Sequence, residues 1–186
     1  MSSSNPASPL IWIDLEFTDL DVKNGKIVEI ATVITDGKLN IIEKGPDIVI
    51  NQPQSVLGKM IHWNQEHFSQ SGLLEEISIS KINVEEAEEK TLLFIKKHCG
   101  PQEGLLAGAS VYVDREFLKE YMPKIYNYVH YRIIDTNTIK ELMHRWYPNL
   151  PDYPNQNAHR SGTDIVESIN ELKYYKANMM KATHEN

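Results

Sequence analysis

The sequence predicts an α/β protein in which a mixed β-sheet, an antiparallel meander extended by parallel strands, is flanked by helices. Two observations support this fold class. Stretches rich in β-branched and large apolar residues follow one another up to residue 50, separated by turn-forming pairs such as Asn24-Gly25 and Asp36-Gly37. Beyond residue 80, helical periodicity alternates with short apolar stretches. The opening meander argues against a plain Rossmann fold.

The individual elements follow from periodicity and from the residues that end each segment. The clearest helix is 83–98, because Asn83 can cap its first turn and Gly100-Pro101 stops it. We predict strands at 10–18, 27–35, 39–43 with a continuation at 47–50, 105–110 and 131–135. We predict helices at 52–68, 83–98, 114–121 (closed by Pro123), 125–129, 136–146 and 161–180, leave 73–80 ambiguous, and predict a loop at 147–156.

Length and composition indicate one globular domain. The chain has 186 residues, of which 41% are hydrophobic and 24% charged, enough for a core without covalent staples. Cys99 is the only cysteine, so the sequence has no disulfide framework and no cysteine-based zinc site, which suits a reducing compartment. The Ser- and Pro-rich residues 1–9 lack Arg and Lys, and we expect a disordered tail there followed by a single domain over 10–182.

Net charge and hydropathy restrict the kinds of nucleic acid and membrane partner that we expect for this protein. A formal net charge of −7 is unfavourable for a protein that clamps long duplexes, because cationic contacts to phosphate supply most of that affinity. It is compatible with a small or metal-bridged nucleic-acid substrate. No apolar stretch has the length needed to span a bilayer, so we expect no membrane partner.

Two acids lie in the first apolar strand. Asp14 and Glu16 are two residues apart, so their side chains should share one face about 6–7 Å apart. Burying two carboxylates in a strand would cost several kcal/mol per charge unless a partner compensates. A divalent cation is such a partner. The alternative for an isolated Asp-x-Glu is an edge strand with two solvated acids.

Three further polar residues lie where the chain leaves its core elements. Each has an ordinary explanation alone: Asp114 as an acid in the first turn of a helix, His159 as a surface or capping residue, and Asp164 as a solvated helical acid. Considered with Asp14 and Glu16, they predict a different site. Four carboxylates can hold two Mg²⁺ ions that stabilise the attacking and leaving oxygens of a phosphoryl displacement. His159, just outside the helix that carries Asp164, could accept a proton near neutral pH.

This combination resembles the oligoribonuclease family of DEDDh 3′→5′ exonucleases, which have a ribonuclease-H-like fold. The resemblance extends from about Leu10 to Met180. The residues that carry it are Ile13-Asp14-Leu15-Glu16-Phe17-Thr18, Ile30-Ala31-Thr32, Asp36, Leu39-Asn40-Ile41, Glu43-x-Gly45-Pro46, Trp63, Ser71-Gly72-Leu73, Asp114-Arg115-x-Phe117-Leu118, Tyr121-Met122-Pro123, His130-Tyr131-Arg132, Asp135-x-x-Thr138-x-Lys140-Glu141-Leu142, Arg145-Trp146 and His159-Arg160-x-x-x-Asp164-Ile165-x-Glu167-Ser168.

The resemblance implies a role for each residue of the acidic set. Asp14 would bridge two Mg²⁺ or Mn²⁺ ions, Glu16 and Asp164 would complete one metal site, and Asp114 would support the other. His159 would be the general base. The implied reaction is attack of a metal-activated water on the 3′-terminal phosphodiester of short RNA, down to dinucleotides, which releases nucleoside 5′-monophosphates.

The resemblance also implies substrate-binding residues in a homodimer. Leu20 matches a residue wedged between bases, and Trp63 one on which a base stacks. Tyr131 and Arg132 match a segment that reaches across the dimer to the 5′ phosphate. The full set of expected substrate contacts is Leu15, Thr18, Leu20, Trp63, His67, Ser110, Tyr131, Arg132 and Asn137.

The chain departs from the family pattern mainly around that phosphate. Ala109 stands where the family usually has Asn, Asn137 where it has Ser, and Phe68 where it has His, with His67 one position earlier. Asp19 replaces a Gly, and Thr163 replaces the first acid of an Asp-Asp pair. Each lost buried donor typically costs about 1–3 kcal/mol of recognition. The metal chemistry is therefore expected to be intact, and recognition of the 5′ end of the substrate to be weakened.

We therefore predict a cytoplasmic, metal-dependent 3′→5′ exoribonuclease, with the mitochondrion as an alternative location because several family members act there. Two alternative functions remain at this point. One is a 3′→5′ exonuclease that trims longer RNA or DNA. The other is a catalytically weak nucleic-acid-binding protein of the same fold.

Overall fold

The computed structural model describes residues 9–154 and 160–180, and within them the chain forms one five-stranded sheet. Its strands lie in the order β3-β2-β1-β4-β5, where β1 is Leu10–Phe17, β2 Ile27–Thr35, β3 Ile41–Val49, β4 Leu105–Gly108 and β5 His130–Asp135. β2 is antiparallel to both β1 and β3, whereas β4 pairs in parallel with β1, and β5 in parallel with β4. The predicted mixed sheet is confirmed.

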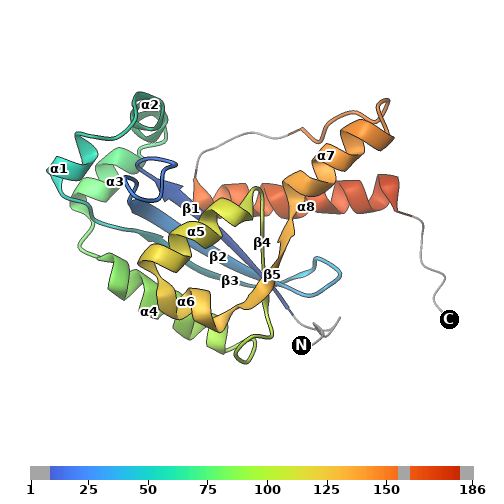
Figure 1. Cartoon of the computed structure of the whole chain (residues 1–186), viewed down its shortest axis with the longest axis horizontal. Helices are drawn as coiled ribbons and strands as arrows, with labels where there is room; N and C mark the ends of the chain where they lie inside the picture. The colour runs from blue at the N-terminus through green and yellow to red at the C-terminus, as the bar shows by residue number, and fades with distance from the viewer. Residues whose placement is uncertain (1–8, 155–159, 181–186) are drawn as a thin grey trace.

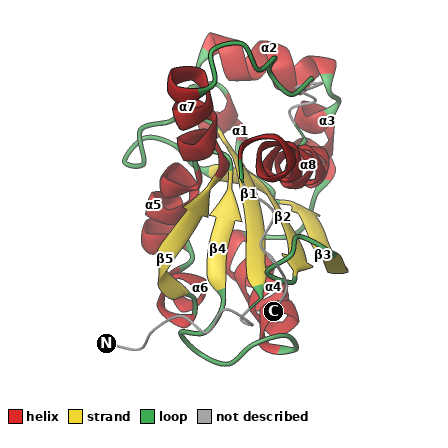
Figure 2. Cartoon of the chain, turned by 90° about the vertical axis from the view of Figure 1, so that its right-hand side faces the viewer, coloured by secondary structure: helices red, strands yellow, loops and turns green. Residues whose placement is uncertain are grey.

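The helices form a layer on each face of this sheet (Figures 1 and 2). Apolar residues of α4, α5 and α6 pack on one face, and those of α8, with Ile139 of α7, pack on the other. The short helices α1, α2 and α3 gather beyond one end of the sheet (Figure 1). The helices are α1 (Gln54–Leu57), α2 (His62–Gln70), α3 (Leu73–Ile79), α4 (Val84–Lys96), α5 (Val111–Tyr121), α6 (Pro123–Tyr128), α7 (Thr136–Trp146) and α8 (Ser161–Met179).

The alternation of side chains along β1 decides which layer meets the predicted acids. Ile11, Ile13 and Leu15 belong to the core formed with α4, α5 and α6, whereas Trp12 packs with Ile165 of α8. Because successive strand residues point to opposite faces, the acids that follow Trp12 at alternate positions lie on the α8 face. The strand therefore presents its carboxylates to the helix that carries Asp164.

The predicted helix over 52–68 is wrong, because this segment forms two helices, α1 and α2. Ile61 between them is extended, with φ −61° and ψ 143°, and its N–H donates to the carbonyl of Thr18 at 3.3 Å. The Asn64 amide donates to the carbonyl of Phe17 at 2.6 Å. These long-range hydrogen bonds outweigh the local helical tendency and place α2, with Trp63, at the end of β1.

Several other boundaries differ from the predictions. The predicted continuation of the third strand is confirmed, because β3 runs unbroken over 41–49 and starts two residues later than predicted, and the ambiguous segment 73–80 forms the helix α3. Pro123 does not only close α5, because it is also the first residue of α6, where a missing N–H has no cost. The predicted tail lies, except for Pro9, outside the described residues, as do residues 155–156 of the predicted loop. None of the described helices is both long and apolar enough to cross a membrane.

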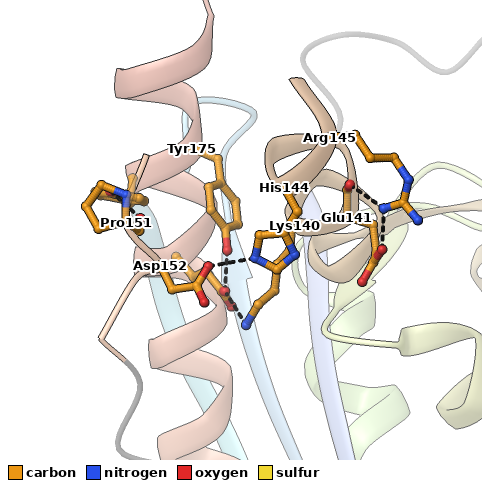
Figure 3. Close-up of polar contacts among 9 residues, drawn as sticks. Lys140, Glu141, His144, Arg145, Pro151, Asp152 and Tyr175 are labelled. Carbon is orange, nitrogen blue, oxygen red and sulfur yellow. Dashed lines mark hydrogen bonds and ion pairs between the residues drawn. The ribbon is translucent and has the colours of Figure 1, made fainter. Parts of the chain in front are cut away.

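Polar contacts fasten α7 and the loop after it to α8 (Figure 3). Glu171 of α8 is buried, accepts a hydrogen bond from the Tyr175 hydroxyl at 2.5 Å and forms an ion pair with Lys140 of α7 at 3.4 Å. In the loop, Asp152 contacts His144 Nε2 at 2.7 Å. α7 and α8 are therefore joined into one layer on the face of the sheet that carries the acids.

Candidate active site

Three of the predicted acids converge where β1 meets the first turn of α8. Asp14, Glu16 and Asp164 each offer a carboxylate oxygen within 4.8 Å of the other two, and all three residues are partly exposed. The small Ala31 faces Asp14 across the β1–β2 ladder. The arrangement leaves the cluster accessible to solutes.

Asp114 lies beside this trio but is oriented differently. It is the fourth residue of α5, is only 5% exposed, and its Oδ1 accepts a hydrogen bond from the Leu15 backbone N–H at 2.9 Å. Its charge raises the pKa of Asp14, so the two carboxylates are electrostatic neighbours. α5 begins at Val111, three residues earlier than predicted, and Asp114 thus lies in its first turn rather than at its start.

The electrostatics of the cluster are those of crowded carboxylates. Burial, followed by the charges of Asp114, Glu16 and Asp164, raises the pKa of Asp14 well above its ordinary value. Burial and then the charge of Glu29 raise the pKa of Glu16 to about 8. Burial raises the pKa of Asp114 to about 7 despite its hydrogen bond from Leu15. The protein alone therefore favours protonated acids near neutral pH.

The donor set fits a hard divalent cation. Carboxylate oxygens are the ligands that Mg²⁺ and Mn²⁺ prefer, and Mg²⁺ keeps several of its waters, so that few protein ligands suffice. A bound cation would favour the ionised form of each acid and reverse the pKa shifts. The acidic cluster thus suggests divalent metal binding, with Asp14, Glu16 and Asp164 as the residues that would hold the metal.

Two expected phosphate-binding residues are joined at the ends of β4 and β5. The Asn137 amide donates to Ser110 Oγ at 2.8 Å, and the Asp135 carboxylate accepts from the backbone N–H of both residues at 3.1 and 2.9 Å. Ser110 has a left-handed backbone, with φ 52°. Such strain in a residue other than glycine is typical of functional sites. Sequence reasoning assigned no role to Asp135, although an Asp that ends a strand before a helix is a common N-cap.

The expected base-stacking residues lie on α2 and on the loop after β1. The rings of Trp63 and His67 stack at 3.8 Å, and both Trp63 and Leu20 are largely exposed. Phe68, which stands at the position of the family's His, is buried in the core under α2 and α3. It is His67 that lies beside Trp63.

The remaining expected site residues are in different environments. Tyr131 and Arg132 on β5 are exposed, with the guanidinium of Arg132 5.3 Å from the Tyr131 ring centre. The side chains of Leu15 and Thr18 are buried, and Thr18 Oγ1 accepts from the Lys26 N–H at 2.9 Å. His159 lies outside the described residues.

Sequence reasoning missed Glu29, which belongs to the same neighbourhood. Glu29 is fully buried on β2 and lies directly opposite Glu16 in the β1–β2 register. It interrupts the apolar stretch Ile27–Thr35 as Asp14 interrupts its own strand. A charge in a strand that is apolar on both faces was a signal that could have identified it.

The fold with its acidic cluster fits one class of protein, the exonucleases. The family model described as "Exonuclease" matches residues 11–172 of this chain. Curated relatives narrow the class. The chain is 47% identical over 167 residues to a probable oligoribonuclease of Caenorhabditis elegans, and the match covers 90% of this chain and 86% of the relative. It is 42% identical to the human protein named "Oligoribonuclease, mitochondrial", over 94% of this chain and 75% of the relative. An oligoribonuclease of Shewanella loihica is also 42% identical, and the match covers 92% of this chain and 96% of that relative.

The chain therefore belongs to the oligoribonuclease family of exonucleases, as the sequence predicted. Solved structures support the fold. Exonuclease I of E. coli in complex with an oligonucleotide is similar with a TM-score of 0.68 at 14% identity over 92% of this chain. Exonuclease I of Methylocaldum szegediense is similar with a TM-score of 0.66 at 16% identity over 94% of this chain. The chain spans only 41% of each of those chains, and the similarity concerns the ribonuclease-H-like fold alone.

The metal-free protein should lose stability as the pH rises from about 4.5 to 8. In that window the folded state keeps a proton on Glu16 that the unfolded chain has already released, so the stabilisation present below pH 4.5 is lost as the pH passes 8. Asp114, with a pKa of about 7, contributes with the same sign.

Melting temperatures in chelator across this pH range test the prediction. Glu16→Gln should show a shallower decline than the parent, and saturating Mg²⁺ should also reduce the decline because it binds ionised carboxylates. Glu116→Gln, an exposed change on α5, should keep the parental slope. Equal slopes for the parent and Glu16→Gln would contradict the shifted pKa.

Proposed function

We propose that this protein is a 3′→5′ exoribonuclease that hydrolyses short oligoribonucleotides, down to dinucleotides, and releases nucleoside 5′-monophosphates. The observation that carries the proposal is the convergence of Asp14, Glu16 and Asp164 in a chain of the oligoribonuclease family. Relatives from animals and bacteria carry the same name, which supports a common substrate class.

The proposed metal ligands are Asp14, Glu16, Asp114 and Asp164, with two Mg²⁺ or Mn²⁺ ions per site. Such ions supply positive charge at the attacking and leaving oxygens of a phosphodiester and lower the pKa of water. Asp14 would serve both ions, and Glu16 and Asp164 would complete one site, which the convergence of the three carboxylates supports. The hydrogen bond from the Leu15 N–H fixes Asp114 beside the cluster, where it would support the other ion.

The proposed substrate contacts surround this cluster. Trp63 and His67 offer an exposed aromatic stack at the end of β1, and base stacking on aromatics tolerates any sequence. Leu20 projects from the adjoining loop to separate bases. The Ser110–Asn137 hydrogen bond offers a polar cap for a terminal phosphate. The direct bond of Asn137 to Ser110 uses part of that polar capacity, which favours longer RNA as the second candidate substrate.

Hydrolysis of 5′-phosphorylated RNA of two and of about seven nucleotides, in Mg²⁺ and in Mn²⁺, tests the proposal. We expect both to be degraded, and Asp164→Ala to abolish the reaction because it removes one of the converging carboxylates. Glu16→Gln should also be inactive, whereas the exposed Glu116→Gln should keep parental turnover.

The other outcomes each have a definite meaning. Degradation of the longer RNA alone would mean that the protein trims longer strands and does not hydrolyse dinucleotides. Near-parental turnover by Asp164→Ala would refute the assigned active site. Hydrolysis of neither RNA would leave a nucleic-acid-binding protein.

His159→Asn should lower kcat by about 10²–10⁴-fold if His159 is the general base, because a positioned proton acceptor contributes a factor of that size. Its Mn²⁺ affinity, measured by calorimetry, should stay near that of the parent. His144→Asn on α7 is the control, since His144 contacts Asp152 rather than the acidic cluster. A His159→Asn protein with parental kcat would exclude the role.

A homodimer is the proposed assembly, in which Tyr131 and Arg132 of one protomer reach the site of its partner. Both residues are exposed on the edge strand β5, where they are available to a second copy. Arg132→Ala and Asp164→Asn should each be nearly inactive. After mixing and exchange of subunits, activity should return to about a quarter of the parental value, because mixed dimers contain one intact site.

Light scattering must show a dimer for this assembly to hold. A monomer, or mixtures no more active than their components, would refute it. The proposed location is the cytoplasm, and the name of the human relative makes the mitochondrion the alternative.

A further inference from the structure

Arg160 is held between two acidic side chains at the start of α8. Its Nε and Nη2 contact Glu29 Oε1 at 3.1 and 3.0 Å, and its Nη1 and Nη2 each donate to an oxygen of Glu76 at 2.9 Å. The two parallel bonds to Glu76 require the planar fork of a guanidinium. Arg160 thus joins three elements, β2, α3 and α8.

Glu29 connects this ion-pair network to the metal-binding acids. Its side chain is fully buried, and it lies opposite Glu16, so the two side chains share a face of the sheet. Its second oxygen accepts from the backbone N–H of Ser161 at 2.9 Å. Ser161 is the first residue of α8, and Asp164 follows within the same turn. Glu29 therefore fixes the turn that presents Asp164.

The packing around this turn leaves little freedom for it to move. A Cβ on Gly162 would lie 2.3 Å from Asp47 Oδ2, so the turn lies directly against β3. The first turn of α8 is thus bounded by Glu29 on β2 and Asp47 on β3, with Arg160 as the cation between the acids. An unpaired Glu29 would add another negative charge beside Glu16, and Arg160 offsets it.

We propose that Arg160 is a positioning residue that, through Glu29 and Glu76, sets the place of Asp164 relative to Asp14 and Glu16 and so determines metal affinity. The part of the proposal that concerns turnover rests on the proposed function. The part that concerns metal binding does not.

The test compares Arg160→Gln, Arg160→Lys and Glu76→Gln with Arg145→Gln in the full chain. Arg145 is the matched control, because it forms an exposed ion pair with Glu141 on α7. Mn²⁺ affinity is measured by calorimetry, kcat and KM with short RNA at saturating Mn²⁺, and melting temperature in chelator. Melting temperatures identify variants that are folded at the assay temperature.

Arg160→Gln should weaken Mn²⁺ binding about tenfold or more, as loss of residues that orient metal ligands typically does. It should lower kcat more than it changes KM. Arg160→Lys keeps the positive charge but loses the planar guanidinium, and Glu76→Gln leaves the contact between Arg160 and Glu29 in place. The Mn²⁺ affinity and kcat of both variants should therefore lie between those of Arg160→Gln and the parent. Arg145→Gln should match the parent in both measurements.

A folded Arg160→Gln with parental Mn²⁺ affinity and kcat would overturn the proposal and reduce the network to a stabilising one. If Arg160→Gln does not fold, Arg160→Lys decides in the same way. A parent that hydrolyses no RNA would refute the proposed function, yet the order of Mn²⁺ affinities would still decide whether Arg160 positions Asp164.

Discussion

The mutual repulsion of Asp14, Glu16 and Asp164 is the constraint on which the rest of this structure depends. Three carboxylates within 4.8 Å of one another would separate if their elements were free to move. The apolar contact between β1 and α8 prevents this. Ile165, Ile169 and Leu172 of α8 are buried against the sheet, and each such side chain contributes about 1.5–3 kcal/mol by burial. Hydrophobic packing thus holds the acids together, and protonation near neutral pH, or a bound cation, would relieve the repulsion between them.

The two helical layers have different tasks. α4, α5 and α6 close the core on the face that carries Ile11, Ile13 and Leu15, and α5 holds the buried Asp114 against the Leu15 backbone beside the cluster. α8, braced by α7 through Lys140 and Glu171, closes the face that carries the acids. Because β1 lies between the antiparallel and the parallel parts of the sheet, its end is reached from both layers. The clustered acids occupy that junction.

Much of the fold was predictable because local signals agreed with the tertiary structure. The β-branched residues of β2 predicted its boundaries correctly, and Asn83 caps α4 through a hydrogen bond from the Glu86 N–H, as expected. The division of 52–68 into α1 and α2 was not predictable from periodicity. It depends on hydrogen bonds from Ile61 and Asn64 to the end of β1, more than 40 residues earlier.

The acidic residues of the site were predictable by type, but their supporting contacts were not. An Asp and a Glu two apart in an apolar strand point to one face whatever the topology, which is why Asp14 and Glu16 could be named together. The partners of Glu29, by contrast, are Arg160 and Ser161 at the start of α8. Arg160 is itself bonded to Glu76 of α3, so these contacts depend on how the helices pack. The left-handed conformation of Ser110 likewise arises from its contacts with Asp135 and Asn137.

Those contacts make residues 110 and 137 a single unit. The Asp135 carboxylate receives the backbone N–H of both, and their side chains bond directly, so neither can change without altering the surroundings of the other. Energetic effects of substitutions at residues in one hydrogen-bond network are generally not additive. An Asn at position 137 therefore affects which side chains are acceptable at 110 and 135, and this corner of the protein should diverge among relatives by coupled rather than independent changes.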